Sequence, residues 1–276
     1  GADGSKAKIL KTSPQIPEMT YENIISCSKT ADVAYVRGMP YSNYRLLTGT
    51  IPCDRKTYVL KGDIPNPGLL LAKDFTKELV KMGIAVTNEA SYISETDKTT
   101  RKTLFVHSSE PLKEIIRHTN HKSDNLYAEM LFRILAYRKG TPCTIKHSVS
   151  FIKEYWKKKG LVLDNARILD GCGLAPQDAL SSSMLVDLLC YMYNSKHKEA
   201  FTASLPCSGE SGTLKSFLRN TELQGKVCAK SGTIGGTKNF AGYIYLPDGR
   251  VWVFAIMVNS ANCRTSKIQS IIEEYL

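Results

Sequence analysis

Two short groups of polar residues in this chain have the chemistry needed to move a proton and to hold a carboxylate. Ser123 opens a Ser-Asp-Asn sequence, and Lys230 opens a Lys-Ser-Gly-Thr sequence 107 positions later. A lysine ammonium group is a compact charge that attracts a carboxylate and can orient a nearby hydroxyl. A hydroxyl held in this way can relay a proton to a leaving nitrogen. We therefore take Ser123 and Lys230 as candidate catalytic residues.

The elements expected around these residues place them at a helix entry and on a strand. An apolar helix is expected over 126–138, so Ser123, Asp124 and Asn125 would lie in the turn before it. Ser, Asp and Asn are also the preferred helix N-cap residues, so this motif taken alone is better explained as a helix cap. Gly232 removes a side chain where a substrate backbone could lie against a strand edge.

The C-terminal third of the chain predicts an antiparallel meander closed by a helix. Strands are expected over 225–231, 239–246 and 250–258, and Pro247-Asp248-Gly249 is typical of the turn of a hairpin. An amphipathic helix over 266–275 would cover one face of this sheet. Helices are also expected over 111–119 and 149–159 and from Ser181 onward. The pattern indicates a mixed α/β fold with an antiparallel sheet flanked by helices.

The first hundred residues are richer in Pro, Gly, Thr and Tyr. Short strands are expected over 33–37 and 56–61, and a helix is expected to begin at Pro67 and to end at Gly83. The helix has apolar residues at helical spacing, which predicts one buried stripe formed by Leu71, Phe75, Leu79 and Met82. Polar residues dominate 87–102, which we interpret as a linker or hairpin.

Composition excludes several classes of protein. The 276 residues carry a net charge of +11, but the basic residues are scattered, and no RRM signature or zinc-finger spacing is present. We therefore expect no nucleic-acid partner; a solvated basic surface, or an anionic cell-wall peptide as partner, explains the charge better. No apolar run reaches the roughly 18 residues that span a bilayer, so we expect no transmembrane segment.

The cysteines and histidines do not predict a metal site, and we expect neither a metal nor a cofactor. The eight cysteines contain no C-x-x-C pair, and an even number permits disulfides whose pairing the sequence does not assign. Cys190 lies on an apolar helix face and is expected to be a core thiol. His118 and His121 have helical spacing but lack a third ligand, so we interpret them as surface residues.

Several further short motifs occur in one order along the chain. They are Gly49–Pro52, Lys122–Glu129, Asp170–Leu174, Ser211–Leu214, Gly225–Thr233 and Phe254–Asn259. With these motifs, the chain from about residue 30 to the C-terminus resembles the D-alanyl-D-alanine carboxypeptidase/endopeptidase family of penicillin-binding proteins, class C type. It departs from the family pattern at Cys172 and Ala175, where serines are usual, and at Ser231, where Thr is usual.

The resemblance implies a β-lactamase/transpeptidase-like fold with a five-stranded antiparallel sheet and inserted accessory segments. Residues 1–105 would be the remainder of an accessory segment with the return to the main domain, and 106–276 the C-terminal portion of the transpeptidase-like domain. Carried over to this chain, the resemblance gives Ser123 the role of proton shuttle and Lys230 that of electrostatic anchor. The substrate-binding residues would be Asn125, Ser231, Gly232 and Thr233, with the Thr233 N–H in the oxyanion hole. Asp124 and Glu129 would be structural.

The nucleophile of this family lies in a Ser-x-x-Lys motif upstream of Ser-Asp-Asn. The string occurs at Ser5, Ser26, Ser150 and Ser195, but none of these is expected at the buried helix N-terminus that a nucleophile requires. We therefore expect the chain to be a fragment without its nucleophile and inactive alone. The parent would be a periplasmic, exported enzyme that acts on peptidoglycan stem peptides and is acylated by β-lactam antibiotics.

Two alternatives remain at this point. A non-catalytic peptidoglycan-binding module would use the same groove to hold stem peptides. A serine β-lactamase is less well supported, because the E-x-x-L-N loop that class A enzymes use for deacylation does not occur around residues 154–164.

Overall fold

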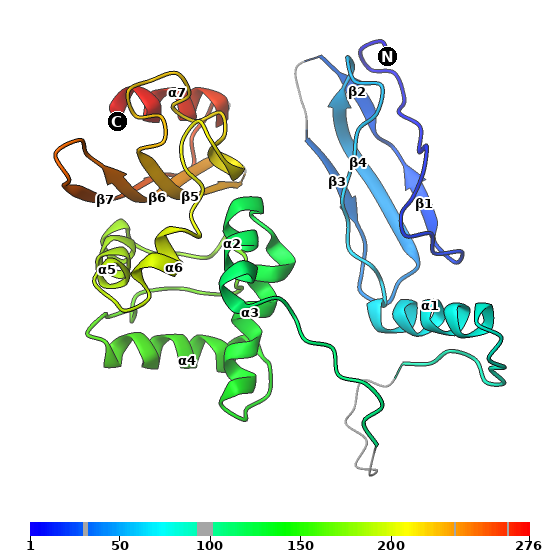
Figure 1. Cartoon of the computed structure of the whole chain (residues 1–276). Helices are drawn as coiled ribbons and strands as arrows, with labels where there is room; N and C mark the ends of the chain where they lie inside the picture. The colour runs from blue at the N-terminus through cyan, green and yellow to red at the C-terminus, as the bar shows by residue number, and fades with distance from the viewer. Residues whose placement is uncertain (30–32, 93–101, 235, 264) are drawn as a thin grey trace. The chain divides into compact units, whose positions relative to one another are not determined.

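The chain consists of two compact units, Gly1–Leu104 and Phe105–Leu276. The computed structural model (Figure 1) describes residues 1–29, 33–92, 102–234, 236–263 and 265–276. The predicted linker over 87–102 falls largely outside these residues. The assignment of residues 1–105 to an accessory segment and 106–276 to the main domain stays a prediction. Each unit is built around its own sheet.

The first unit contains a four-stranded mixed sheet. Its central strand β4 (Tyr44–Pro52) pairs in parallel with β1 (Thr20–Asn23) and β2 (Ser26–Ser28) and antiparallel with β3 (Val33–Arg37). Strand β3 appears where the sequence predicts it. The strand expected over 56–61 is wrong, because the structure assigns these residues to no strand.

The helix predicted after Asn66 is present, but its environment differs from the prediction. Helix α1 (Pro67–Lys81) begins with the Asn66 side chain accepting a hydrogen bond from the Leu69 amide, and Gly83 follows its C-cap in the left-handed region. The prediction of a buried stripe is wrong: Leu71, Phe75 and Met82 are 72%, 62% and 75% exposed. Helical spacing places these side chains on one face, but nothing in the described part of the first unit covers that face.

The second unit contains the predicted meander. Strands β5 (Val227–Ile234), β6 (Thr237–Tyr245) and β7 (Val251–Val258) pair antiparallel in this order. The turn between β6 and β7 has Gly249 in the left-handed region, and the Asp248 side chain accepts a hydrogen bond from the Arg250 amide. Within the described residues this sheet has three strands, rather than the five that the resemblance implies.

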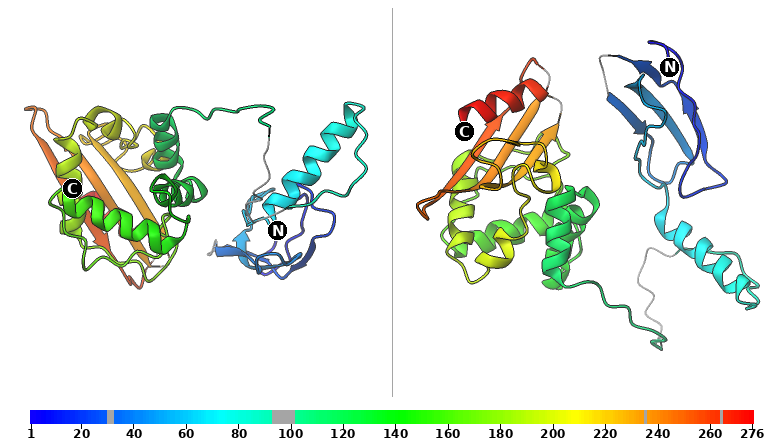
Figure 2. Two further views of the ribbon diagram at one scale, coloured as in Figure 1. Left: turned by 90° about the horizontal axis from the view of Figure 1, so that it is seen from below. Right: turned by 45° about the horizontal axis from the view of Figure 1, so that its top comes forward.

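Helices cover both faces of this sheet and define two cores (Figures 1 and 2). One core joins the sheet to helix α7 (Thr265–Tyr275) through residues such as Val227, Ala229 and Ile268. The other lies toward helices α5 (Ser182–Tyr193) and α6 (Lys198–Thr202) and contains Cys228 and Tyr243. Because side chains alternate along β5, its odd-numbered residues face α7 and its even-numbered residues face the other layer. The predicted α/β layer fold is confirmed.

Three further helices of the second unit lie beside these two cores. Helix α2 (Leu112–Lys122) continues past its predicted end at 119, and α3 (Asn125–Arg138) follows directly. Helix α4 (Ile145–Lys158) begins earlier than predicted, because the Thr144 hydroxyl caps it by accepting from the His147 amide. On α3 the residues facing solvent are themselves apolar: Leu126, Met130, Ile134 and Tyr137. Among the described residues, no helix combines the length and the apolar character that crossing a bilayer requires.

The cysteines include one disulfide, between Cys207 and Cys228. The segment around Cys207 pairs with the start of β5, since the Ser208 amide donates to Val227 and the Ala229 amide donates to Pro206. The prediction that Cys190 is a core thiol is wrong, because its residue is exposed on α5 while the adjacent Leu189 is buried. The apolar face of α5 is therefore centred one residue away from the position expected.

Candidate active site

The Ser-Asp-Asn sequence ends one helix and begins the next. Ser123 is the C-cap of α2 in a left-handed conformation, with φ of 51°. Asp124 is the N-cap of α3, and its carboxylate accepts a hydrogen bond from the Tyr127 amide at 3.2 Å. Asn125 is the first residue of α3 and is exposed. The capping interpretation therefore applies to Asp124, and the Ser123 hydroxyl remains available for another role.

Lys230 reaches this turn from β5. Its Nζ donates a hydrogen bond to Ser123 Oγ at 2.8 Å and another to the Ser231 carbonyl oxygen at 2.6 Å. As an even-numbered residue of β5, Lys230 projects from the face opposite α7, where the end of α2 lies (Figure 1). Burial lowers the pKa of Lys230 below its ordinary value. The ammonium group is thus desolvated, held in one position, and aimed at a hydroxyl.

The edge of β5 that faces away from β6 is covered only at its beginning. Residues 206–208 pair with Val227 and Ala229 on this edge. The backbone groups of alternate residues point the same way, so those of Ser231 and Thr233 also face this edge. The Thr233 amide has no backbone acceptor there within the described residues. An extended peptide could add to the edge at this point.

Gly232 lies on the same exposed stretch. A Cβ atom at this position would have only one neighbour within 4 Å, Cβ of Asn239, at 4.0 Å. Neither steric contact nor a left-handed backbone therefore requires glycine here. The absence of a side chain leaves room above the strand edge instead.

A short 3-10 helix, η1 (Gly212–Leu214), joins α2 to β5. The Ser231 hydroxyl donates to Thr213 Oγ1 at 2.9 Å, and Leu214 is fully buried in the core beneath α7. A Cβ atom at Gly212 would lie 2.8 Å from the carbonyl oxygen of His121, so only glycine lets η1 approach the end of α2 this closely. Thr213 was not among the predicted site residues. It belongs to the Ser211–Leu214 motif, but this motif did not indicate a role for any particular side chain.

Glu129 and Asp170 hold a turn against α3. The Glu129 carboxylate accepts from the Gly171 amide at 2.7 Å and from Arg133 Nε at 2.6 Å. Burial raises the pKa of Asp170, but hydrogen bonds from the four backbone amides of residues 172–175 outweigh it and lower this pKa overall. Ligand atoms of Glu129, Asp170 and Cys172 lie within 4.8 Å of one another. These carboxylates are already acceptors of structural hydrogen bonds, so we interpret the cluster as a turn support.

Both predicted surface histidines lie on α2. His118 is partly exposed, with Nε2 at 3.6 Å from Asp124. His121 is half-buried, and its Nε2 has no hydrogen-bond partner within the described residues. Burial, and then the charges of Arg117 and Lys122, lower the pKa of His121. The interpretation as a surface residue therefore suits His118 better than His121.

In none of the four Ser-x-x-Lys strings does the serine lie within the first turn of a helix. Ser5 donates to the Ala2 carbonyl, Ser26 lies in β2, and Ser150 lies on the exposed side of α4. Ser195 follows α5 and donates to the Met192 carbonyl, while Lys198 lies over the Tyr193 ring. No serine of these strings therefore has the position that a nucleophile requires.

The close approach at Gly212 makes a testable prediction. Replacing Gly212 with Ala should lower the free energy of unfolding by about 2–3 kcal/mol, because it adds a clash with α2 to the strain of a left-handed backbone. Gly173→Ala is the matched control, since Gly173 is also left-handed but a Cβ there meets nothing within 4 Å. It should cost about 1 kcal/mol. Urea unfolding measures both; equal losses would contradict the close packing of η1 against α2.

Comparison with known proteins gives the family of this chain. The D-Ala-D-Ala carboxypeptidase 3 (S13) family matches residues 2–275. A D-alanyl-D-alanine carboxypeptidase of Actinomadura sp. strain R39 is 26% identical over 267 residues, which is 94% of this chain and 49% of the relative. The D-alanyl-D-alanine carboxypeptidase DacB of Haemophilus influenzae is 24% identical and covers 79% of this chain and 46% of its own length.

A solved structure shares the fold. Penicillin binding protein 4 from Haemophilus influenzae, in complex with a β-lactam, aligns with a TM-score of 0.79 at 20% identity, covering 100% of this chain and 65% of that one. This likeness shows the fold alone. The chain spans about half the length of the curated relatives it matches. With a family match over almost its entire length, the chain belongs to the D-Ala-D-Ala carboxypeptidase 3 (S13) family.

Proposed function

We propose that this chain supplies the proton-transfer and carboxylate-binding groups of a serine-type D-Ala-D-Ala carboxypeptidase/endopeptidase acting on peptidoglycan stem peptides. The observation that carries the proposal is the 2.8 Å hydrogen bond from Lys230 Nζ to Ser123 Oγ. It joins two motifs that are far apart in the sequence at an open strand edge. Family membership and the two named D-alanyl-D-alanine carboxypeptidases support the reaction class.

The strand edge would bind the substrate as an added strand. The backbone of a D-Ala-D-Ala terminus would lie along Ser231–Thr233, where Gly232 leaves space. Its carboxylate would contact the Ser231 and Thr233 hydroxyls and the Lys230 charge, and Asn125 would bind the amide side of the peptide. The Thr233 N–H would donate to the oxyanion that forms at the attacked carbonyl. Such a donor typically contributes about 3 kcal/mol to a transition state.

Acyl transfer requires a proton to reach the leaving amine. The attacking serine gives up its hydroxyl proton as its oxygen forms a bond to the carbonyl carbon, the C–N bond to the terminal D-alanine breaks, and the leaving amine takes a proton. Ser123 would pass this proton on, since its hydroxyl both donates to a leaving nitrogen and accepts from Lys230. Water then attacks the acyl-serine and releases the shortened peptide. We assign the attacking serine to none of the four Ser-x-x-Lys strings in this chain.

The cellular location follows from the proposed substrate. Peptidoglycan lies outside the cytoplasmic membrane, so we propose that the parent protein acts in the periplasm and that β-lactams acylate it. The net charge of +11 favours an anionic cell-wall polymer as the surrounding surface.

The first test is binding of a stem-peptide mimic ending in D-Ala-D-Ala. Lys230→Met should weaken its binding about tenfold or more, because a charge-assisted hydrogen bond contributes about 1.5–3 kcal/mol. Lys215→Met, at an exposed lysine near the end of η1, should bind like the unchanged chain. NMR chemical-shift titration measures the dissociation constants, and a C-terminally amidated peptide shows whether the carboxylate is the group recognised.

The pH dependence gives an independent readout of the same prediction. Lys230 binds a carboxylate only while protonated, and burial lowers its pKa. Affinity should therefore fall as pH rises through a value below the ordinary lysine pKa of about 10.4. In Lys230→Arg this fall should disappear, since the guanidinium stays charged. Equal affinities in Lys230→Met and Lys215→Met would contradict the proposed role of Lys230.

A non-catalytic peptidoglycan-binding module is the second candidate. The observation that favours it is that no Ser-x-x-Lys serine lies within the first turn of a helix. The structure does not support the β-lactamase alternative. Glu154 lies in the region where the deacylating carboxylate of a class A enzyme would be expected, but it is exposed on α4 and pairs with Lys158.

Covalent labelling separates an acylating chain from a binding one. We expect the 276-residue chain, incubated with a fluorescent penicillin and run on a denaturing gel, to carry no covalent label, because no serine of the four Ser-x-x-Lys strings has the position of a nucleophile. A purified D-Ala-D-Ala carboxypeptidase is the positive control. Stoichiometric labelling that heat denaturation abolishes would show that this chain contains its own nucleophile.

A further inference from the structure

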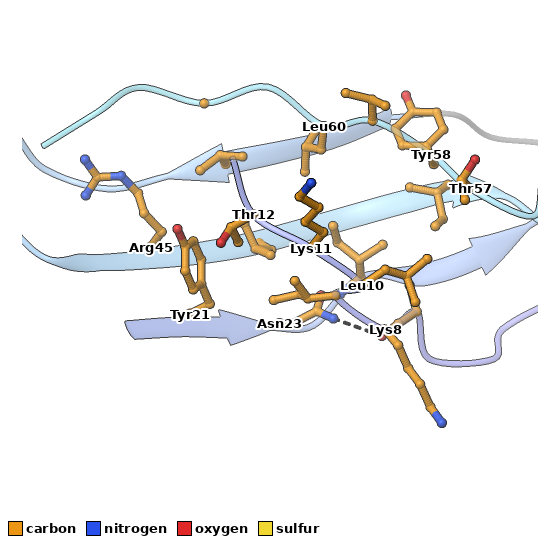
Figure 3. Close-up of a pocket in the computed structure, with 18 of the residues that line it drawn as sticks. Lys8, Leu10, Lys11, Thr12, Tyr21, Asn23, Arg45, Thr57, Tyr58 and Leu60 are labelled. Carbon is orange, nitrogen blue, oxygen red and sulfur yellow. Dashed lines mark hydrogen bonds between the residues drawn. The ribbon is translucent and has the colours of Figure 1, made fainter. Parts of the chain in front are cut away.

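The first unit contains a partly open cavity of about 820 Å³ that the proposed function does not use. It lies between the inner face of the four-stranded sheet and two extended segments, within residues 5–16 and 55–65 (Figure 3). All of its lining residues precede residue 66, so none belongs to the Ser123–Lys230 site. A volume of this size is within the range of small-molecule sites.

The sheet gives the cavity an apolar wall. Alternate residues of β4 face it, including Leu47 and Ile51, and Val36 of β3 and Ile25 between β1 and β2 add to this wall. The crossing segments add further apolar side chains, of which Leu10 and Leu60 are visible in Figure 3. An elongated apolar ligand would therefore have contacts on both sides.

A buried guanidinium group lies in the same wall. Arg45 is 1% exposed, and its terminal nitrogens donate to the Ser42 and Tyr44 carbonyls and to Asp63. Its Nε has no hydrogen-bond partner within the described residues. Because Nε is itself buried and the guanidinium is already paired with Asp63, Arg45 forms part of the cavity wall and offers no free donor to a ligand.

The charge around the cavity is positive. The charged side chains that line it are one carboxylate, Asp63, and six cationic groups, those of Lys6, Lys8, Lys11, Arg45, Arg55 and Lys56. Figure 3 shows Lys11 extended over the middle of the cavity, whereas Lys8 points away from it. An anionic group would therefore be attracted to Lys11 in particular.

We propose that this cavity binds an amphiphile with one long apolar chain and an anionic carboxylate or phosphate head. The apolar chain lies along Ile25, Leu47 and Ile51. Lys11, which extends over the cavity, supplies the opposite charge for the head group. The inference does not depend on the proposed peptidase function, since no residue is shared.

Calorimetric titration of the whole chain tests this site with three probes of one chain length. Dodecanoate and dodecyl phosphate should each bind with a stoichiometry of one, and binding of only one of them would support the site and identify its head group. Dodecyl maltoside, which is uncharged, should bind at least about tenfold more weakly, the loss expected for a charge-assisted hydrogen bond. All probes are kept below their micelle concentrations.

Two variants locate the binding. Lys11→Met should weaken the anionic probes about threefold or more, as expected for a partly exposed ion pair, whereas Lys61→Met, an exposed lysine that does not line the cavity, should not. Leu60→Trp should occupy part of the cavity and weaken binding, with an unchanged circular dichroism spectrum showing that the chain still folds. Lys230→Met should bind the probes normally.

Absence of one-to-one binding by both anionic probes would overturn the proposal. So would equal affinity for dodecyl maltoside, or equal losses in Lys11→Met and Lys61→Met.

Discussion

The hydrogen bond between Lys230 and Ser123 is the interaction on which the interpretation of this chain depends. It joins the end of a helix to the middle of a strand across 107 residues of sequence. A buried ammonium group is costly unless its donors are satisfied, and here one donor is directed at a hydroxyl and another at the Ser231 carbonyl. The desolvation that lowers the pKa of Lys230 also strengthens its attraction for an incoming anion.

The surrounding structure positions both partners of this bond. On the strand side, the β5–β6 register places Lys230 opposite Ala241. On the helix side, Ser123 is held in a left-handed conformation between α2 and α3, a strained state that the two helix ends together impose. Gly212 lets η1 support both the helix side and the strand side of the bond. The backbone of η1 contacts the end of α2, and the Thr213 hydroxyl contacts Ser231. A shift of any one element would lengthen the bond.

The sequence was most informative where local chemistry is decisive. Pro247-Asp248-Gly249 predicts the β6–β7 hairpin because few residues suit such a turn, and the two motifs predict that Ser123 and Lys230 meet. The predictions from sequence failed where the structure depends on packing between segments that are far apart in the chain. The apolar residues of α1, and Cys190 on α5, have the right helical spacing. Spacing alone does not determine which face of a helix another element will cover. The Cys207–Cys228 pair and the role of Thr213 likewise require the fold to bring separate segments together.

The central claim, that Ser123 and Lys230 act as one unit, is tested most directly by a double-mutant cycle. Ser123→Ala, Lys230→Met and the double variant are compared by their affinity for a D-Ala-D-Ala peptide at neutral pH. If the two side chains are coupled, the double variant should lose less affinity than the sum of the single losses, by about 0.5–3 kcal/mol. Strictly additive losses would show that the hydroxyl and the ammonium group act independently and would contradict the account.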